Sequence, residues 1–178
     1  MDNDTLLGKA PIPRAVAAMA IPSVISSLVT VVYNMADTFF VGQTGDALQV
    51  AAVSLTNPIF ILLMAFANMF GMGGSAIISV ALGENNHQSV KRISSFISWA
   101  SLVVGAAFAA VLLCFTAPIL HLFGADASTF EFARGYTVYI AFGAPFVIWS
   151  AAASFVVRAE GASKEAMIGS MIGTIANI

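Results

Sequence analysis

The sequence predicts an all-α fold, a polytopic integral membrane helix bundle with four complete transmembrane helices and the start of a fifth. The first observation is composition: of 178 residues, 59% are hydrophobic and 9% are charged, and the mean hydropathy is +0.92. A water-soluble domain carries about 25% charged residues. The second is that the charges leave long uncharged runs. The third is that these runs are continuously apolar rather than alternating, which disfavours a membrane β-barrel.

The uncharged runs define the membrane spans. Each of the first four is longer than the roughly 20 residues that cross the hydrocarbon core as a helix. A fifth run, at 166–178, is too short to cross. The four runs cover residues 15–36, 47–83, 93–125 and 135–157. With glycine-containing breaks between them, the runs predict helices at about 14–41, 50–82, 89–116, 131–157 and 164–178.

Lysine and arginine residues gather on one side of the predicted spans. Basic residues are retained in cytoplasmic loops, whereas the opposite side here has only Arg134. This asymmetry predicts a multi-pass protein of the cytoplasmic (inner) membrane with a cytoplasmic N-terminus. The basic residues of the first side are Lys9, Arg14, Lys91, Arg92, Arg158 and Lys164.

Several classes of function find no support in the sequence. The formal net charge is −2, so there is no basic excess to suit a nucleic acid. His87 and His121 lie on opposite sides of the membrane and cannot share a metal ion. No HExxH, GxSxG, Walker or GxGxxG pattern has usable context. We therefore expect no enzyme, no metal centre and no cofactor, and the single Cys114 cannot form an intrachain disulfide.

Polar residues recur every three or four positions along the first predicted span, which places them on one helix face. For the serines and for Thr30, a hydrogen bond to the preceding turn explains the residue as well as a binding role does. Asn34 and Asp37 need a further explanation. The stripe consists of Ser23, Ser26 or Ser27, Thr30, Asn34 and Asp37.

Asp37 is the only Asp, Glu, Lys or Arg residue in the four apolar runs and their apolar flanks. Carboxylates at such positions face a bundle interior or a watery cavity and mark ion pathways. The alternative is an interfacial carboxylate near the outer helix end. A dry pocket would favour proton uptake by Asp37, whereas nearby oxygen donors would favour a hard cation such as sodium. Either event removes one charge, so Asp37 is our candidate for coupling an ion gradient to a conformational change.

Other polar residues in the spans allow more than one interpretation. Asn68, deep in the second span, favours a hydrogen bond between helices over ligand binding. Tyr136 and Tyr139 lie just inside the outer boundary, where an aromatic belt is the simplest explanation, although a cavity-facing ring would contact an organic cation. A GxxxG segment spans 169–173, and Asn177 lies one turn further along the same face, where its amide can bond across helices.

Three segments resemble the multidrug and toxic compound extrusion (MATE) transporters. The first is Ile21-Pro22 followed by Tyr33-Asn34-Met35-Ala36-Asp37-Thr38-Phe39-Phe40-Val41-Gly42. The second is Gly71-Met72-Gly73-Gly74-Ser75, leading to Ser79 and Gly83, and the third is Arg158-Ala159-Glu160-Gly161, leading to Asn177. The segments occur in the order of the family and span nearly the whole chain. Each is weak alone, and together they are specific.

The resemblance implies an exporter of drugs or organic cations, driven by inward flow of protons or sodium and built from two six-helix lobes. Residues 1–178 would form part of the N-terminal lobe and would pack in the lipid bilayer against the remaining helices and the C-terminal lobe. Asp37 would be the ion-coupling carboxylate, and Asn177 would lie near it. Acidic, amide and aromatic groups suit a cavity that attracts a cation, and its candidate lining residues are Thr30, Asn34, Asn68 and Tyr136.

Two alternatives remain open. A lipid-linked sugar flippase of the same superfamily would need a strongly basic cavity for pyrophosphate, but only Asp37 is charged within the spans. A non-transporting membrane scaffold subunit would use its glycines for assembly alone. Because the sequence stops early in the fifth helix, we expect a fragment of a transporter, which would not transport by itself.

Overall fold

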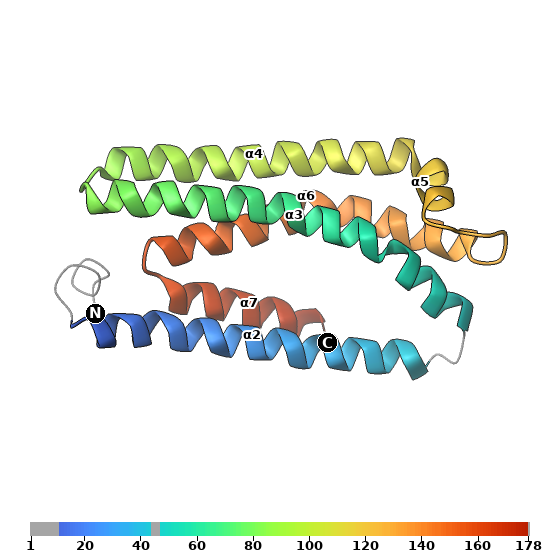
Figure 1. Cartoon of the computed structure of the whole chain (residues 1–178), viewed down its shortest axis with the longest axis horizontal. Coiled ribbons are helices and arrows are strands. Elements are labelled where there is room, and N and C mark those ends of the chain that lie inside the picture. Colours follow the sequence, from blue (N-terminus) through green and yellow to red (C-terminus); the bar gives the residue numbers. More distant parts are fainter. Residues whose placement is uncertain (1–10, 44–46, 178) are drawn as a thin grey trace.

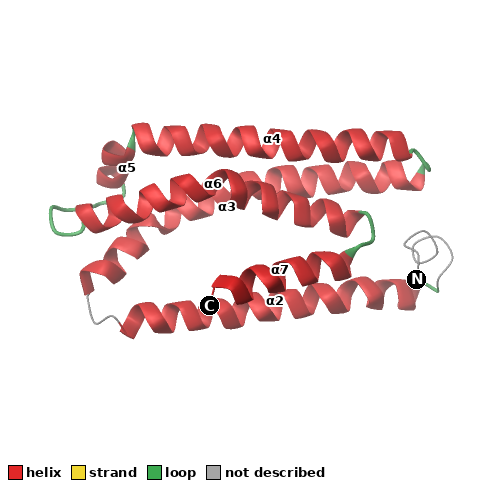
Figure 2. Cartoon of the chain, turned by 180° about the vertical axis from the view of Figure 1, so that it is seen from behind, coloured by secondary structure: helices red, strands yellow, loops and turns green. Residues whose placement is uncertain are grey.

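The computed structural model describes residues 11–43 and 47–177, without the side chains at positions 34, 37, 38, 40–42, 47, 49 and 175–177. Within these ranges the secondary structure is helical and no strand is present (Figure 2). In chain order, the helices are α2 (Ile12–Gln43), α3 (Ala47–Gly83), α4 (His87–Cys114), α5 (Thr116–Leu122), α6 (Phe130–Ala159) and α7 (Ser163–Asn177).

Four of the described helices, α2, α3, α4 and α6, are long and apolar enough to cross a membrane. The shortest of them has 28 residues, which at about 1.5 Å per residue exceeds the thickness of the hydrocarbon core. Helix α7 has 15 residues. The predicted fold class, an all-α membrane bundle with four long helices and the start of a fifth, is confirmed.

The structure divides the third predicted helix, which sequence analysis extended to about residue 116. Helix α4 ends at Cys114, and the short helix α5 begins at Thr116. Between them Phe115 has φ −117° and ψ 23°, which is outside helical geometry. Pro118 fits the first turn of α5 because no helical hydrogen bond is required of its nitrogen there. The surrounding residues are almost all apolar, so composition gave no sign of this break.

The helices form two groups. Helices α3, α4 and α6 pack into a three-helix unit, and α2 packs on α7 (Figure 1). Helix α7 also contacts α6, which it follows after a tight turn at Gly161. Gly161 has φ +84°, a left-handed conformation that glycine adopts without steric strain. Helices α2 and α7 run side by side in the same direction (Figures 1 and 2).

Small residues let the helices of the three-helix unit approach closely. A side chain at Gly71 of α3 would collide with Phe155 of α6, and one at Gly74 would collide with Ile97 of α4. Such close approach increases van der Waals contact, which drives helix association where the solvent is itself apolar. The three-helix unit is therefore the tightly packed part of the molecule.

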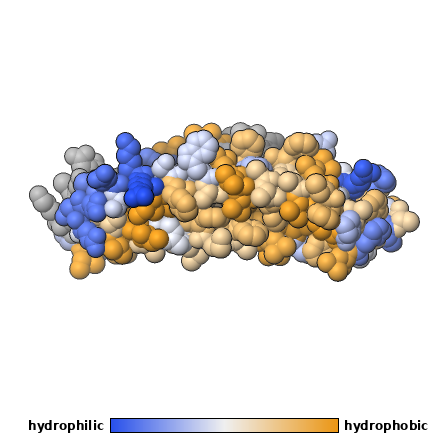
Figure 3. Space-filling model, turned by 90° about the horizontal axis from the view of Figure 1, so that it is seen from above, coloured by the Kyte–Doolittle hydropathy of each residue, from blue (hydrophilic) through white to orange (hydrophobic). Residues whose placement is uncertain are grey.

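The face of the molecule seen in Figure 3 is mostly apolar, and hydrophilic residues gather toward its two ends. Helix α2 illustrates this, because Val24, Leu28 and Val31 are all more than half exposed. In water a monomer with such a surface would be unstable, whereas in lipid the surface matches the surrounding hydrocarbon. The polar ends then lie at the two membrane–water interfaces.

Candidate ion-coupling and substrate site

One pair of hydroxyl groups joins α2 to α7. The Oγ atom of Ser26 lies 2.8 Å from the Oγ atom of Ser170. The Ser170 hydroxyl also lies 2.8 Å from the carbonyl oxygen of Met167, to which it donates. Since a serine hydroxyl has one hydrogen, Ser170 accepts from Ser26 when it donates to Met167. Both hydroxyls are then satisfied, in a short chain that crosses between the helices.

The other described hydroxyls on the polar face of α2 stay within their own helix. Ser23 donates to Met19 at 2.9 Å, Ser27 donates to Ser23 at 3.0 Å, and Thr30 donates to Ser26 at 3.0 Å, in each case to the carbonyl oxygen. These bonds to the preceding turn satisfy a hydroxyl inside an apolar span. The role of Thr30 in a substrate cavity stays a prediction.

The side chains of Asn34, Asp37 and Asn177 lie outside the described residues, although α2 and α7 include their positions. Helix geometry still relates these positions to the serine pair. Position 37 is about 20° around α2 from Ser26, and position 177 is about 20° around α7 from Ser170. Because the two helices run in the same direction, positions 37 and 177 differ in height by about 6 Å. A shared site for Asp37 and Asn177 stays a prediction.

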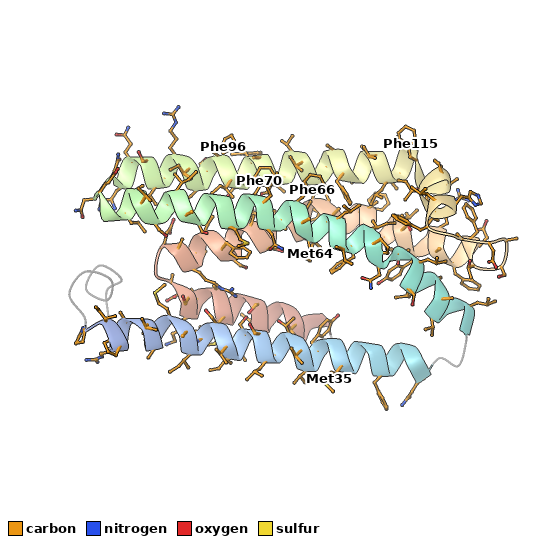
Figure 4. All side chains as sticks on the ribbon, viewed as in Figure 1. Met35, Met64, Phe66, Phe70, Phe96 and Phe115 are labelled. Carbon is orange, nitrogen blue, oxygen red and sulfur yellow. The ribbon has the colours of Figure 1, made fainter. Side chains whose placement is uncertain are left out.

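Asn68 lies one helical turn after Met64 on α3. Met64, which is labelled in Figure 4, packs against the cluster that includes Ala144 and Ile148 of α6. The Asn68 side chain is exposed and makes no hydrogen bond to the described residues, so it does not join the described helices. The hydrogen-bonding groups of this amide are therefore available to another molecule. Its contact with a substrate stays a prediction.

The two tyrosines of α6 differ in exposure. Tyr139 is 79% exposed and Tyr136 is 44% exposed. The greater exposure of Tyr139 suits a residue in an aromatic belt, whereas Tyr136 is more covered by its neighbours. A role for Tyr136 in cation binding stays a prediction.

Sequence reasoning missed Ser170 as a partner of the first span. The available signal was a second polar stripe, because Ser170, Thr174 and Asn177 recur at spacings of four and three residues. Thr174 donates to the carbonyl oxygen of Ser170 at 2.9 Å, as Thr30 donates to Ser26 on the facing helix. The described parts of α2 and α7 thus carry matching hydroxyl-rich faces.

A hollow of about 450 Å³ lies where α3 begins, beside the link between α5 and α6. Asp126 borders it, and one of its carboxylate oxygens accepts hydrogen bonds from the backbone nitrogen and hydroxyl of both Ser128 and Thr129. The bonds from the Ser128 and Thr129 side chains are the main reason that the pKa of Asp126 falls to about 2. Asp126 therefore stays ionised and stabilises the start of α6. The hollow is lined by Ala51, Ser54, Leu55, Pro58, Phe123, Gly124, Asp126 and Thr129.

At the opposite end of the bundle, a side-chain hydrogen bond joins α4 to the end of α6. The Ser94 hydroxyl donates to Oε1 of Glu160 at 3.1 Å. Nearby in sequence, Nε of Arg158 is buried and has no hydrogen bond to the described residues. No group of three or more metal-ligating side chains occurs among the residues that the structure describes.

Four long apolar helices with polar ends define a multi-pass membrane protein. The MatE family model matches residues 22–178, and the chain belongs to this family. The resemblance to the MATE transporters seen in the sequence is thereby confirmed.

Relatives with similar sequences are multidrug export proteins rather than enzymes. The multidrug export protein MepA of Staphylococcus saprophyticus is 34% identical over 170 residues, which cover 96% of this chain and 38% of that protein. MepA of Staphylococcus aureus strain NCTC 8325 is 32% identical with the same coverage. The chain thus spans less than two fifths of the length of these relatives.

Solved structures of MATE proteins share the fold. An outward-facing multidrug resistance MATE family transporter of the MOP superfamily matches with a TM-score of 0.92 and 25% identity, over 99% of this chain and 39% of that one. A MOP superfamily transporter from Pyrococcus furiosus matches with a TM-score of 0.91 and 24% identity, over the same shares of the two chains. The arrangement of the six described helices is therefore that of one part of a MATE transporter.

Proposed function

We propose that the chain forms part of the N-terminal lobe of a cation-coupled antiporter that exports drugs or organic cations. The names of the MepA relatives, which are multidrug export proteins, support this class of substrate. The proposal depends most on one observation: Asp37 is the only Asp, Glu, Lys or Arg residue in the apolar runs and their apolar flanks, on a helix whose polar face contacts α7. An isolated carboxylate in that setting is suited to exchange its charge with an ion.

The mechanism follows from the charge balance at Asp37. When the carboxylate is ionised, it attracts a cationic substrate into the lobe. When it binds a proton or a sodium ion, that attraction is lost and the substrate leaves. The two ligands then compete for one negative charge, so each lowers the affinity of the protein for the other. Asn177 would hold the carboxylate and ion in place with its amide.

The substrate would occupy the polar surface between α3, α6 and the α2–α7 pair. Asn68 would supply an exposed amide from α3. Thr30 and Asn34 precede Asp37 on the polar stripe of α2, and Tyr136 would offer its ring to a cation. Apolar side chains around these groups would accept the hydrocarbon part of varied drugs.

The test is substitution of Asp37→Asn in the full-length protein, reconstituted in lipid vesicles with an imposed proton or sodium gradient. We expect Asp37→Asn to lose ion-driven export under whichever gradient drives the unsubstituted protein. Asp126→Asn is the matched control, because it removes a carboxylate outside the spans and the asparagine side-chain oxygen can still accept hydrogen bonds from the same turn. Full ion-driven export by the Asp37→Asn protein would exclude the proposed role of this residue.

The orientation of the lobe is part of the proposal. The links α3–α4 and α6–α7 lie at the same end of the molecule as the start of α2 (Figure 1). The helix ends beside these links carry Lys91, Arg92, Arg158 and Lys164, and the basic excess supports a cytoplasmic location for this end. The hollow at Asp126 would then face outward.

A further inference from the structure

We propose that the Ser26–Ser170 pair is a positioning contact for the coupling site, which holds α2 against α7 so that positions 37 and 177 meet. The inference deepens the proposed function and rests on it. Its structural basis is the 2.8 Å contact between the two hydroxyl oxygens.

Burial distinguishes Ser26 from the other described side chains of α2. Ser26, which is 5% exposed, is the only buried side chain among those that the structure describes on α2. Contacts between apolar side chains add van der Waals packing in a bilayer but form no directional bond. A hydrogen bond between helices is directional and does select one.

The contact is placed to transmit its effect to the coupling site. Position 37 follows Ser26 by three helical turns, and position 177 follows Ser170 by two, on the same edges of their helices. A rotation of α2 about its axis would therefore carry position 37 away from α7 by the same angle as Ser26. Without the hydrogen bond between Ser26 and Ser170, α2 would be free to make that rotation.

The first experiment measures ion-driven export by the full-length protein across a range of coupling-ion concentrations. Ser26→Ala and Ser170→Ala should each weaken the apparent affinity for the coupling ion by about threefold, the scale of one hydrogen bond between membrane helices. The double variant should show no greater shift than either single variant, since one contact is lost in all three. Ser27→Ala is the matched control, because Ser27 donates only to its own helix.

A change in maximal rate without a change in ion affinity would overturn the inference, because a general structural defect gives that result. An equal affinity shift in Ser27→Ala would overturn it as well. The outcome remains distinct from that of the Asp37→Asn test. If Asp37 is required but both serine variants keep normal ion affinity, the positioning role fails while the proposed function stands.

The second experiment tests the contact without measuring transport. In full-length protein that lacks other cysteines, with Cys114→Ser, the pair Ser26→Cys and Ser170→Cys should form a disulfide under mild oxidation. The control pair Ser27→Cys and Ser170→Cys should react much more slowly, because Ser27 lies about 100° further around the helix. Equal rates for the two pairs would show that α2 does not present Ser26 to α7 and would overturn the inference.

Discussion

The described serine and threonine hydroxyl groups on α2 bond either to a carbonyl oxygen of α2 itself or to a side chain of α7. Only the second kind of bond links two helices. Ser23, Ser27 and Thr30 bond to carbonyl oxygens of their own helix, so they satisfy a polar group without linking anything. Ser26 instead reaches Ser170 on another helix. A single residue can therefore orient a helix whose remaining described surface is largely apolar.

Asp126 gives a prediction about acid stability. Hydrogen bonds from Ser128 and Thr129 lower its pKa from 3.8 to about 2, so folding favours the carboxylate. The stability that it contributes is present above its ordinary pKa and is lost as the pH falls through about 2. The melting temperature of the unsubstituted protein should exceed that of Asp126→Asn near pH 5. This difference should shrink toward pH 2, and thermal melts in detergent would measure it.

A difference in melting temperature that stays constant over this pH range would contradict that account of Asp126. The comparison cancels the effect of acid on other carboxylates, because both proteins share them. The hydrogen bonds from Ser128 and Thr129 to Asp126 close the turn that leads into α6.

At the scale of helices, the backbones of α4 and α6 approach closely where Gly105 of α4 meets Pro145 of α6. A side chain at Gly105 would collide with the backbone of Pro145 and approach the carbonyl oxygen of Ala144. Backbone atoms cannot relieve such a collision by changing rotamer, as a side chain can. The crossing therefore depends on the missing side chain of Gly105.

We expect Gly105→Ala to destabilise the protein by about 1–3 kcal/mol, the usual cost of overpacking. Gly73→Ala is the control, since a side chain there would meet nothing within 4 Å. It should be neutral or slightly stabilising because alanine has the higher helix propensity. Thermal unfolding of the full-length protein in detergent would measure both, and equal melting temperatures for the two variants would contradict the described crossing.

The sequence predicted whole helices better than it predicted their contacts. Uncharged runs located the four spans because a charge in the bilayer core is costly. The break at Phe115 was missed because its neighbours are as apolar as a continuous helix would require. The Ser26–Ser170 pair was missed for another reason: spacing within a helix shows which residues share a face, but not which helix lies opposite.

At the scale of the whole molecule, the tight α3–α4–α6 unit and the α2–α7 pair meet mainly where α7 contacts α6. Alternating access in transporters of this kind involves movement of one helix group against another. The division described here gives the lobe two groups with few direct contacts, and the coupling carboxylate would belong to the smaller one.

Orientation in the membrane is tested by chemical labelling. In protein that lacks other cysteines, a membrane-impermeant thiol reagent should label Ser128→Cys in intact cells, because that link would face outward. Glu84→Cys should be labelled only after permeabilisation. Both residues are exposed in the structure, so access is limited by the membrane alone. The reverse pattern would mean that the end of the molecule with most of the basic residues faces outward.

The most direct measurement of the central claim is the release of the coupling ion from purified full-length protein when an exported drug is added. Competition for Asp37 predicts that the unsubstituted protein releases protons, or sodium, as the drug binds. The Asp37→Asn protein should release neither, while Asp126→Asn should behave as the unsubstituted protein does. Equal ion release from the Asp37→Asn protein would contradict the account, because the exchanged charge would then lie elsewhere.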